Sequence, residues 1–260
     1  MATLKYILYS FAGVLLMISC GEKKDTKGTS EKVEHKRNNF VEEVENAHKK
    51  EKFLNNDVIS FDLDLSFGGQ PRLNGKFITK TNSQDAVIIY NTGDTLYIND
   101  DDVFASSLFK EQKSLRFDAY TWTYFFLLPY KLSDQGAMVD DLGLKNEHKK
   151  AKLTFGKDVG DAPDDWYMLH IDKQNNLLDY VAYIVTANKT KEEAEEDPHA
   201  IRYFAYEQID GIQIASQWEF YEWSEGKELS KKIGEAQIKN ISFAPVDETF
   251  FTPPKGYVSI

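Results

Sequence analysis

The sequence is poor in the side chains that common catalytic mechanisms use. Among its 260 residues are one cysteine and five histidines. The cysteine, Cys20, has no second cysteine with which to form a disulfide. The motifs HExxH, CxxC and Gly-x-Ser-x-Gly do not occur, so nucleophilic and zinc-hydrolytic mechanisms have no support. We therefore expect no enzyme, no catalytic residue, no metal site and no cofactor.

Positive charge is also scarce. Lysine and arginine number 31 against 42 acidic residues, a net charge of -11. Because duplex binding needs clustered Lys and Arg, we expect no nucleic-acid partner. The acidic runs at 100–102 and 192–197 lack the spacing of a calcium loop, which favours a solvated turn or helix face. A third candidate begins at Asp172 but has Leu177 where a calcium loop needs glycine, and is predicted to be a hairpin turn.

No hydrophobic run is long enough to cross a membrane. The run from Ile7 to Ile18 follows Lys5 and ends at Ser19 and Cys20, whereas a spanning helix needs about 20 apolar residues. This pattern predicts a cleaved signal peptide over residues 1–19. The residues before Cys20 resemble a lipobox, and the resemblance implies that the Cys20 sulfur receives diacylglycerol. The alternative is an ordinary signal peptide that happens to end at a cysteine, which would leave a free thiol in an oxidising compartment.

Composition divides the rest of the chain into two parts. Residues 21–38 mix charges of both signs with almost no bulky apolar side chains, which is typical of a flexible segment. We interpret residues 20–38 as the lipidated cysteine and a tether with a reach of roughly 25 Å. Residues 39–260 form a single β-rich domain in this interpretation.

The domain alternates apolar and polar residues with a period of two in most of its segments. After an amphipathic helix predicted over 40–52, this pattern predicts strands at 58–67, 75–81, 86–90, 96–99, 152–155, 166–171, 177–186, 200–207, 212–223 and 236–243. Connectors such as Asp210-Gly211 are typical of tight hairpins. Because tight hairpins join antiparallel neighbours, we expect an α+β fold that is mainly antiparallel β, and a parallel α/β barrel is disfavoured.

One aromatic segment, residues 117–132, breaks the strand rhythm. Its apolar side chains lie at helical spacing and cover almost the whole surface of a helix, which Pro129 ends or kinks. Such a helix is buried, either as plain core or as the lining of a hydrophobic cavity, and the residues leave both open. The candidate cavity residues here and in the strands are Tyr120, Trp122, Tyr124, Phe125, Phe126, Trp166, Trp218 and Phe220. His170, on the face of Trp166 and Met168, is interpreted as structural.

Three segments carry a resemblance to the LolA/LolB-like superfamily and to Bacteroidota lipoproteins within or beside it. They are residues 164–172 with Leu177 and Leu178, residues 201–206 with Gly211 and Ile212, and residues 247–254. The resemblance covers roughly residues 45–256. It implies a curved, unclosed β-barrel wrapped around a few helices, with an apolar cavity that in LolA-like proteins accepts acyl chains.

Three hypotheses follow for the function. The leading one is a non-enzymatic cell-envelope lipoprotein that binds a lipid or a lipoprotein acyl chain, anchored by its N-terminal lipid to the periplasmic face of a Gram-negative outer membrane. The second is an envelope interaction or assembly protein with a fully packed core. The third is a hydrolase that uses Asp164 and Asp165 beside Trp166. The oligomeric state stays open.

Overall fold

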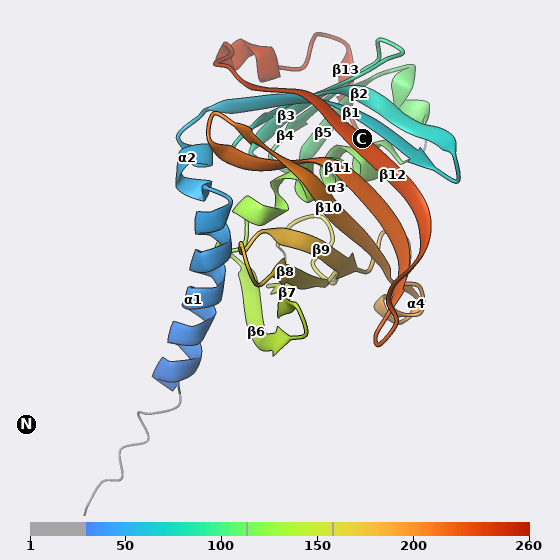
Figure 1. The fold of residues 1–260 in the computed structure, drawn as a ribbon. Helices are drawn as coiled ribbons and strands as arrows, with labels where there is room; N and C mark the ends of the chain where they lie inside the picture. The colour runs from blue at the N-terminus through green and yellow to red at the C-terminus, as the bar shows by residue number, and fades with distance from the viewer. Residues whose placement is uncertain (1–29, 113, 158) are drawn as a thin grey trace, which may run out of the picture.

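A single curved antiparallel sheet is the frame of the molecule (Figure 1). The computed structural model describes residues 30–112, 114–157 and 159–260, with side chains from Asn39 onward. The sheet has thirteen strands in the order β13-β5-β4-β3-β2-β1-β12-β11-β10-β9-β8-β7-β6 and is not closed into a barrel. The expected α+β class, mainly antiparallel with a curved and unclosed sheet, is confirmed.

The strands follow one another along the chain with few interruptions. Their bounds are β1 Val58–Phe67, β2 Gln70–Lys80, β3 Asp85–Tyr90, β4 Thr95–Asn99, β5 Asp102–Ser106, β6 Ala137–Lys145, β7 His148–Phe155, β8 Tyr167–Asp172, β9 Leu178–Tyr183, β10 His199–Ile209, β11 Ile212–Ser224, β12 Glu228–Phe243 and β13 Tyr257–Ser259. The β10–β11 turn has φ values of 50° at Asp210 and 73° at Gly211. Two consecutive positive φ values are typical of the type I′ hairpin that this pair predicts.

Helix α3, Leu115–Leu127, lies inside the curve of the sheet (Figure 1). The 3₁₀ turn η2, Leu128–Tyr130, continues it and contains Pro129. The ring of Phe126 stacks on Phe61 of β1 at a centroid distance of 4.0 Å, and Phe125 lies 4.9 Å from Tyr183 of β9. Aromatic pairs add about 0.5–1.5 kcal/mol each beyond area burial, so the aromatic segment joins distant strands into one core.

The N-terminal helical region differs from the single helix predicted over 40–52. Helix α1 spans Ser30–Ala47 and α2 spans Lys50–Leu54. Lys49 between them has a left-handed φ of 62°, which ends α1. Helix α1 thus begins within the range assigned to the tether, and the signal peptide and Cys20 lie outside the described residues. The remaining helical segments are η1 Phe109–Glu111, α4 Lys191–Glu195 and η3 Glu248–Phe251.

The buried hydrophobic residues form one large inner cluster and two smaller outer clusters, one of which contains Val58, Ile78, Val87 and Phe251. The inner cluster contains α3, Phe40 and Val44 of α1, and Phe53 of α2. The second smaller cluster, which we call the outer cluster, forms around Trp166 and Tyr180. In the described part of the chain, no helix combines the length and apolar character needed to span a membrane. Apolar packing on the concave side therefore holds the helices to the sheet.

Candidate ligand-binding site

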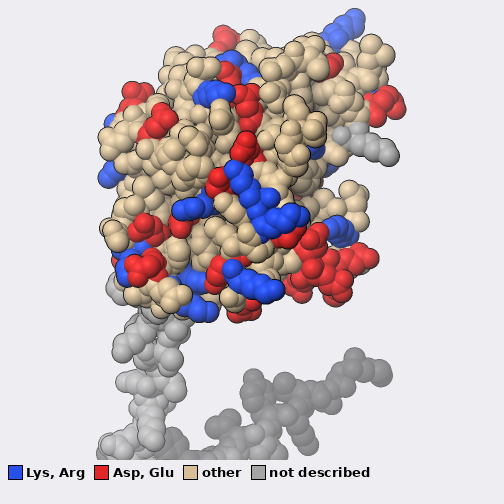
Figure 2. All heavy atoms as spheres, turned by 45° about the vertical axis from the view of Figure 1, so that its right-hand side comes forward, with Lys and Arg blue, Asp and Glu red and all other residues tan. Residues whose placement is uncertain are grey.

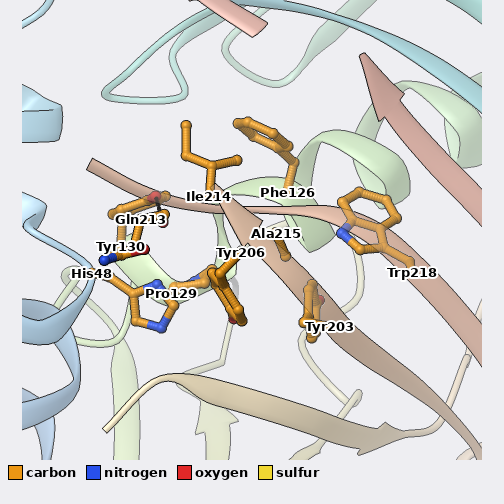
Figure 3. A pocket seen from close by; sticks show the side chains of 10 residues that line it. All are labelled: His48, Phe126, Pro129, Tyr130, Tyr203, Tyr206, Gln213, Ile214, Ala215 and Trp218. Atoms are coloured by element: carbon orange, nitrogen blue, oxygen red, sulfur yellow. Dashed lines mark hydrogen bonds between the residues drawn. The ribbon is translucent and has the colours of Figure 1, made fainter. Parts of the chain in front are cut away.

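A small pocket lies between the concave side of the sheet and the helices (Figure 3). It is built from the end of α1, the junction of α3 and η2, and strands β10 and β11. The residues that line it are His48, Phe126, Pro129, Tyr130, Tyr203, Tyr206, Gln213, Ile214, Ala215 and Trp218. The polar side chains of His48, Tyr130 and Gln213 gather on one side of the pocket in Figure 3. Apolar walls with a few polar groups are typical of ligand sites.

An irregularity in strand β10 explains why two of its tyrosines face the pocket. Tyr203 and Tyr206 are three residues apart, whereas side chains of a regular strand share a face at even spacing. Ala205, between them, has a left-handed φ of 50°, and its carbonyl accepts a hydrogen bond from the Ser216 hydroxyl at 2.8 Å. This local irregularity allows both tyrosines to line the same pocket.

Each phenol at the pocket donates its hydroxyl hydrogen to a backbone carbonyl. Tyr130 donates to Gln213 at 2.9 Å, and Tyr206 donates to Leu178 at 2.6 Å. Tyr203 donates to the carbonyl of Phe125, within α3, at 3.0 Å. Buried hydroxyls need such partners, because a missing hydrogen bond costs about 1–3 kcal/mol. These bonds fix the rings and connect strands to helices across the interior.

His48 is the titratable group of the pocket. It is fully buried, and its Nε2 accepts a hydrogen bond from the Leu178 amide at 3.1 Å. Burial lowers its pKa from 6.5 to about 3, and the Gln213 backbone opposes this only in part. The ring is therefore neutral at pH 7, and because Nε2 accepts, Nδ1 carries the hydrogen. Within the described residues, Nδ1 has no hydrogen-bond partner.

The pocket is too small for an acyl chain. The space open to the centre of a water molecule is about 10 Å³, and a single water needs roughly 10–15 Å³ on that measure. The surrounding interior is filled by bulky side chains such as Phe61, Trp218 and Phe220, each almost completely buried. A chain-sized cavity at this place requires side chains or helices to move.

The predicted cavity residues are distributed over three places. Phe126 and Trp218 line the pocket. Trp122, Phe125 and Phe220 lie elsewhere in the inner cluster. Tyr120 and Tyr124 pack against the margin of this cluster, and Trp166 lies outside it.

Tyr124 contacts Phe155 and Tyr167 at the margin of the inner cluster, and the Tyr120 hydroxyl donates to the carbonyl of Asp100 at 3.3 Å. Trp166 belongs to the outer cluster, on the opposite face of the sheet. It precedes β8, where successive side chains alternate between the two faces. The prediction grouped residues of both faces because the aromatic type alone does not give the face.

Eight of the ten lining residues were not among the predicted cavity residues, and five of these eight carry polar side chains. These five are Tyr130, Tyr203, Tyr206, Gln213 and His48. His48 follows Val41 and Val44 at helical spacing in the helix predicted over 40–52, so a histidine on the apolar face of that helix was the available signal. Tyr203 and Tyr206 gave none, because their shared orientation depends on the irregularity in β10.

The two carboxylates of the hydrolase hypothesis do not face one cleft. Asp165 is buried and accepts hydrogen bonds from the Thr186 amide at 2.8 Å and the Thr186 hydroxyl at 2.7 Å. Burial raises its pKa, and the Thr186 bonds oppose the rise. Asp164 is exposed. The Asp165 carboxylate therefore has the arrangement of a structural group that holds the segment at Thr186 in place.

Among the described residues, no group of three or more His, Cys, Asp or Glu side chains is placed to hold a metal ion. His170 is fully buried on the outer face and stacks on Tyr180 at 3.8 Å. It lies on the same side as Trp166 and Met168, as the alternation of β8 predicted.

No family model and no curated protein sequence matches the chain. Solved structures do match. A LolA superfamily protein from Nitrosomonas europaea has a TM-score of 0.55 at 9% identity, over 81% of this chain and 97% of that one. A DUF1329 family protein from Desulfovibrio piger has a TM-score of 0.54 at 12% identity, over 83% and 96% of the chains.

A third solved structure is a domain assigned to an outer membrane lipoprotein-sorting protein from Vibrio parahaemolyticus. It has a TM-score of 0.51 at 11% identity, over 82% of this chain and 95% of that one. At these identities the likeness shows the fold. The chain therefore has a LolA-like fold over most of its length.

Proposed function

We propose that this chain is a membrane-anchored, non-enzymatic lipoprotein of the Gram-negative cell envelope. It binds an acyl chain in the pocket that His48 and Tyr206 help to line. The observation that carries the proposal is a pocket between helices and concave sheet in a LolA-like fold. The similarity to a domain assigned to lipoprotein sorting supports the same class of ligand. The predicted lipidation of Cys20 supports the anchor.

Binding requires the pocket to enlarge, and the helical pair at its edge is the element we expect to move. His48 lies where α1 ends, and Tyr130 stacks on Phe53 of α2 at 3.9 Å. The left-handed residue Lys49 separates the two helices. Displacement of α2 with the Phe53 ring would uncover Tyr130 and extend the pocket toward Phe126. The described structure then represents the closed state.

Lipid binding can be tested on protein purified from membranes and on the soluble domain. Native mass spectrometry should detect bound lipid, and a fluorescent C16 fatty acid should bind the soluble domain. Ala215→Phe adds a ring at the pocket wall, and we expect at least about a tenfold loss of affinity, which corresponds to about 1.4 kcal/mol. Gln217→Phe adds the same ring to the same strand at an exposed position and should bind normally.

The second candidate function is an envelope interaction protein with a permanently packed core. The observation that favours it is the size of the pocket, which accommodates a water molecule only. In that case neither experiment detects lipid, and cross-linking in cells yields a protein partner instead. Equal fatty-acid binding by the two phenylalanine variants would also reject the pocket as the binding place.

A further inference from the structure

The outer cluster lies beneath the end of the β11–β12 hairpin. Strand β10 begins at His199, which pairs with Glu222 of β11, so the hairpin residues from Trp223 to Leu229 extend past the start of β10. Trp223 and Leu229 pack against the outer cluster that contains Trp166 and Tyr180. The Trp166 and Trp223 rings meet at 6.2 Å. In Figure 1 this end of the hairpin lies beside α4.

One carboxylate fastens the hairpin to strands with which it does not pair. Glu228 accepts a hydrogen bond from Lys150 of β7 at 2.9 Å and from the Tyr180 hydroxyl of β9 at 2.8 Å. The Trp223 indole donates to the same carboxylate at 3.4 Å. Burial alone would raise the pKa of Glu228, but the bonds from Lys150 and Tyr180 lower it to about 2. The Glu228 backbone, next to the β11–β12 turn, has a left-handed φ of 57°.

A neutral imidazole lies directly beneath this carboxylate. His170 Nδ1 donates to the Met168 carbonyl at 3.0 Å, and its Nε2 is 3.4 Å from Glu228 Oε2. Nε2 has no hydrogen-bond partner in the part of the chain that is described. Burial, with Lys150 nearby, lowers the pKa of His170 to about 3 despite the Glu228 charge.

The other charged groups around His170 already have hydrogen-bond partners. His148 of β7 meets the His170 ring edge-on at 5.8 Å and bonds Asp179 of β9 at 2.7 Å. Arg202 of β10 donates to the other Asp179 oxygen at 3.3 Å. Figure 2 shows acidic and basic side chains mixed over the face that includes the hairpin. The group that changes charge when the hairpin lifts near neutral pH is therefore His170, whereas Glu228 stays ionised in both states.

We propose that the β11–β12 hairpin is an acid-released clasp, which Glu228 holds shut over β7 and β9 and whose release uncovers Trp166 and Trp223. With the clasp shut, His170 is buried and neutral. With it open, His170 lies in water and takes up a proton near its ordinary pKa of 6.5. Because the open state binds more protons, falling pH favours opening. The ratio of open to shut molecules rises about tenfold between pH 7.5 and 5.5.

Hydrogen exchange of the full soluble domain, corrected for the intrinsic pH dependence of exchange, tests the clasp. Amides at 223–230 should show about a tenfold higher opening ratio at pH 5.5 than at pH 7.5. The β1–β2 turn at 67–70, which has no histidine in contact, is the internal reference. An equal change at the two hairpins overturns the proposal.

Two pairs of variants separate the clasp from general acid sensitivity. His170→Phe keeps a ring on Tyr180 but cannot titrate, and it should abolish the pH dependence at 223–230; His170→Gln is a second replacement if the first fails to fold. His199→Gln removes a partly exposed histidine and should leave the dependence intact. Glu228→Gln should raise opening at pH 7.5, whereas Glu222→Gln, on the same hairpin with the exposed partner Lys231, should not. Persistence of the pH dependence in His170→Phe contradicts the proposal.

Discussion

At the scale of single residues, the phenols of the pocket and the Nε2 of His48 all bond backbone groups, and His48 shows the consequence. Its Nε2 must be unprotonated to accept from the Leu178 amide. Protonation in the folded state would leave a charge among aromatic rings, with Tyr130 and Tyr206 edge-on at 6.0 and 5.7 Å. A neutral, buried His48 suits an apolar pocket. Because the unfolded chain can protonate this histidine and the folded domain cannot, it also makes the domain sensitive to acid.

We predict that His48 destabilises the domain as pH falls below 6.5. Its pKa is about 3 when folded and 6.5 ordinarily, so the unfolded chain binds the additional proton between these values and stability is lost in that window. The free energy of unfolding should fall by about 2 kcal/mol from this group between pH 7 and 5. Urea unfolding of His48→Gln should show a smaller loss over that range, and an unchanged loss would contradict the assignment.

Arg72 and Asp118 form an ion pair in which the carboxylate is buried. Asp118 of α3 is 3% exposed and accepts two bonds from the Arg72 guanidinium, at 2.7 and 3.2 Å. Arg72→Leu leaves the carboxylate with the Trp122 indole as donor. Removing one partner of such a pair costs about 3–5 kcal/mol when both are buried. Since Arg72 is 36% exposed, we expect roughly 2–3 kcal/mol.

Urea midpoints at pH 7 measure this cost. Asp118→Asn keeps an acceptor for the Trp122 indole and removes the charge, so it should destabilise less than Arg72→Leu. Equal losses in the two variants would mean that the uncompensated charge is not the cause.

At the scale of elements, the break between α1 and α2 depends on one residue with left-handed backbone. Lys49 has a φ of 62°, and its amide bonds the Asn46 carbonyl at 3.1 Å. Glycine takes this conformation without the penalty of about 1–2 kcal/mol that L-residues incur. Lys49→Gly should therefore raise the unfolding free energy by up to about 1 kcal/mol after its larger unfolded-state entropy is included.

Lys49→Ala is the matched control, because it removes the same charge but retains the strain, and it should be nearly neutral. The measurement is the shift in thermal midpoint of each variant against the wild type. If both variants shifted the midpoint equally, charge and not conformation would explain the effect.

The strands that the sequence predicted are those with one buried face. In β1, Phe61, Leu63 and Leu65 are buried while Asp62 and Asp64 face outward. Strands β5, β6 and β13 and the first half of β12 were not predicted. Strand β6 lies at the edge of the sheet and exposes Met138, Leu142 and Leu144 together with acids, so no single face carries the pattern. The start of β12 has no apolar alternation: it exposes Lys231 and Lys232, since the hairpin extends past the start of β10.

The pocket was predictable in kind but not in composition. A buried aromatic helix against a sheet predicts an apolar interior, and Phe126 and Trp218 do line the pocket. Which other residues join them depends on sheet curvature and on the φ of Ala205. The local pattern of side chains predicts neither property, because both arise when distant strands pack.

At the scale of the whole molecule, the proposed function joins a closed domain to an anchor. The domain carries its ionisable groups largely in pairs at the surface, such as Lys232 with Glu219 and Glu235. Its excess of acidic residues does not favour binding to anionic headgroups. In the proposed function, attachment to a membrane therefore comes from the N-terminal lipid, and Cys20, the single cysteine of the sequence, is the residue that would carry it.

We predict that Cys20→Ser releases the protein from the membrane without changing the domain. Acyl chains contribute about 0.8 kcal/mol per buried methylene, so loss of the lipid removes the attachment. After fractionation of cells, the wild type should sediment with membranes and the variant should appear in the soluble envelope fraction. Labelling with a palmitate analogue should mark the wild type alone. Ser19→Ala retains a small residue before the cysteine and should behave like the wild type, whereas a membrane-bound, unlabelled Cys20→Ser would mean that the domain itself holds the membrane.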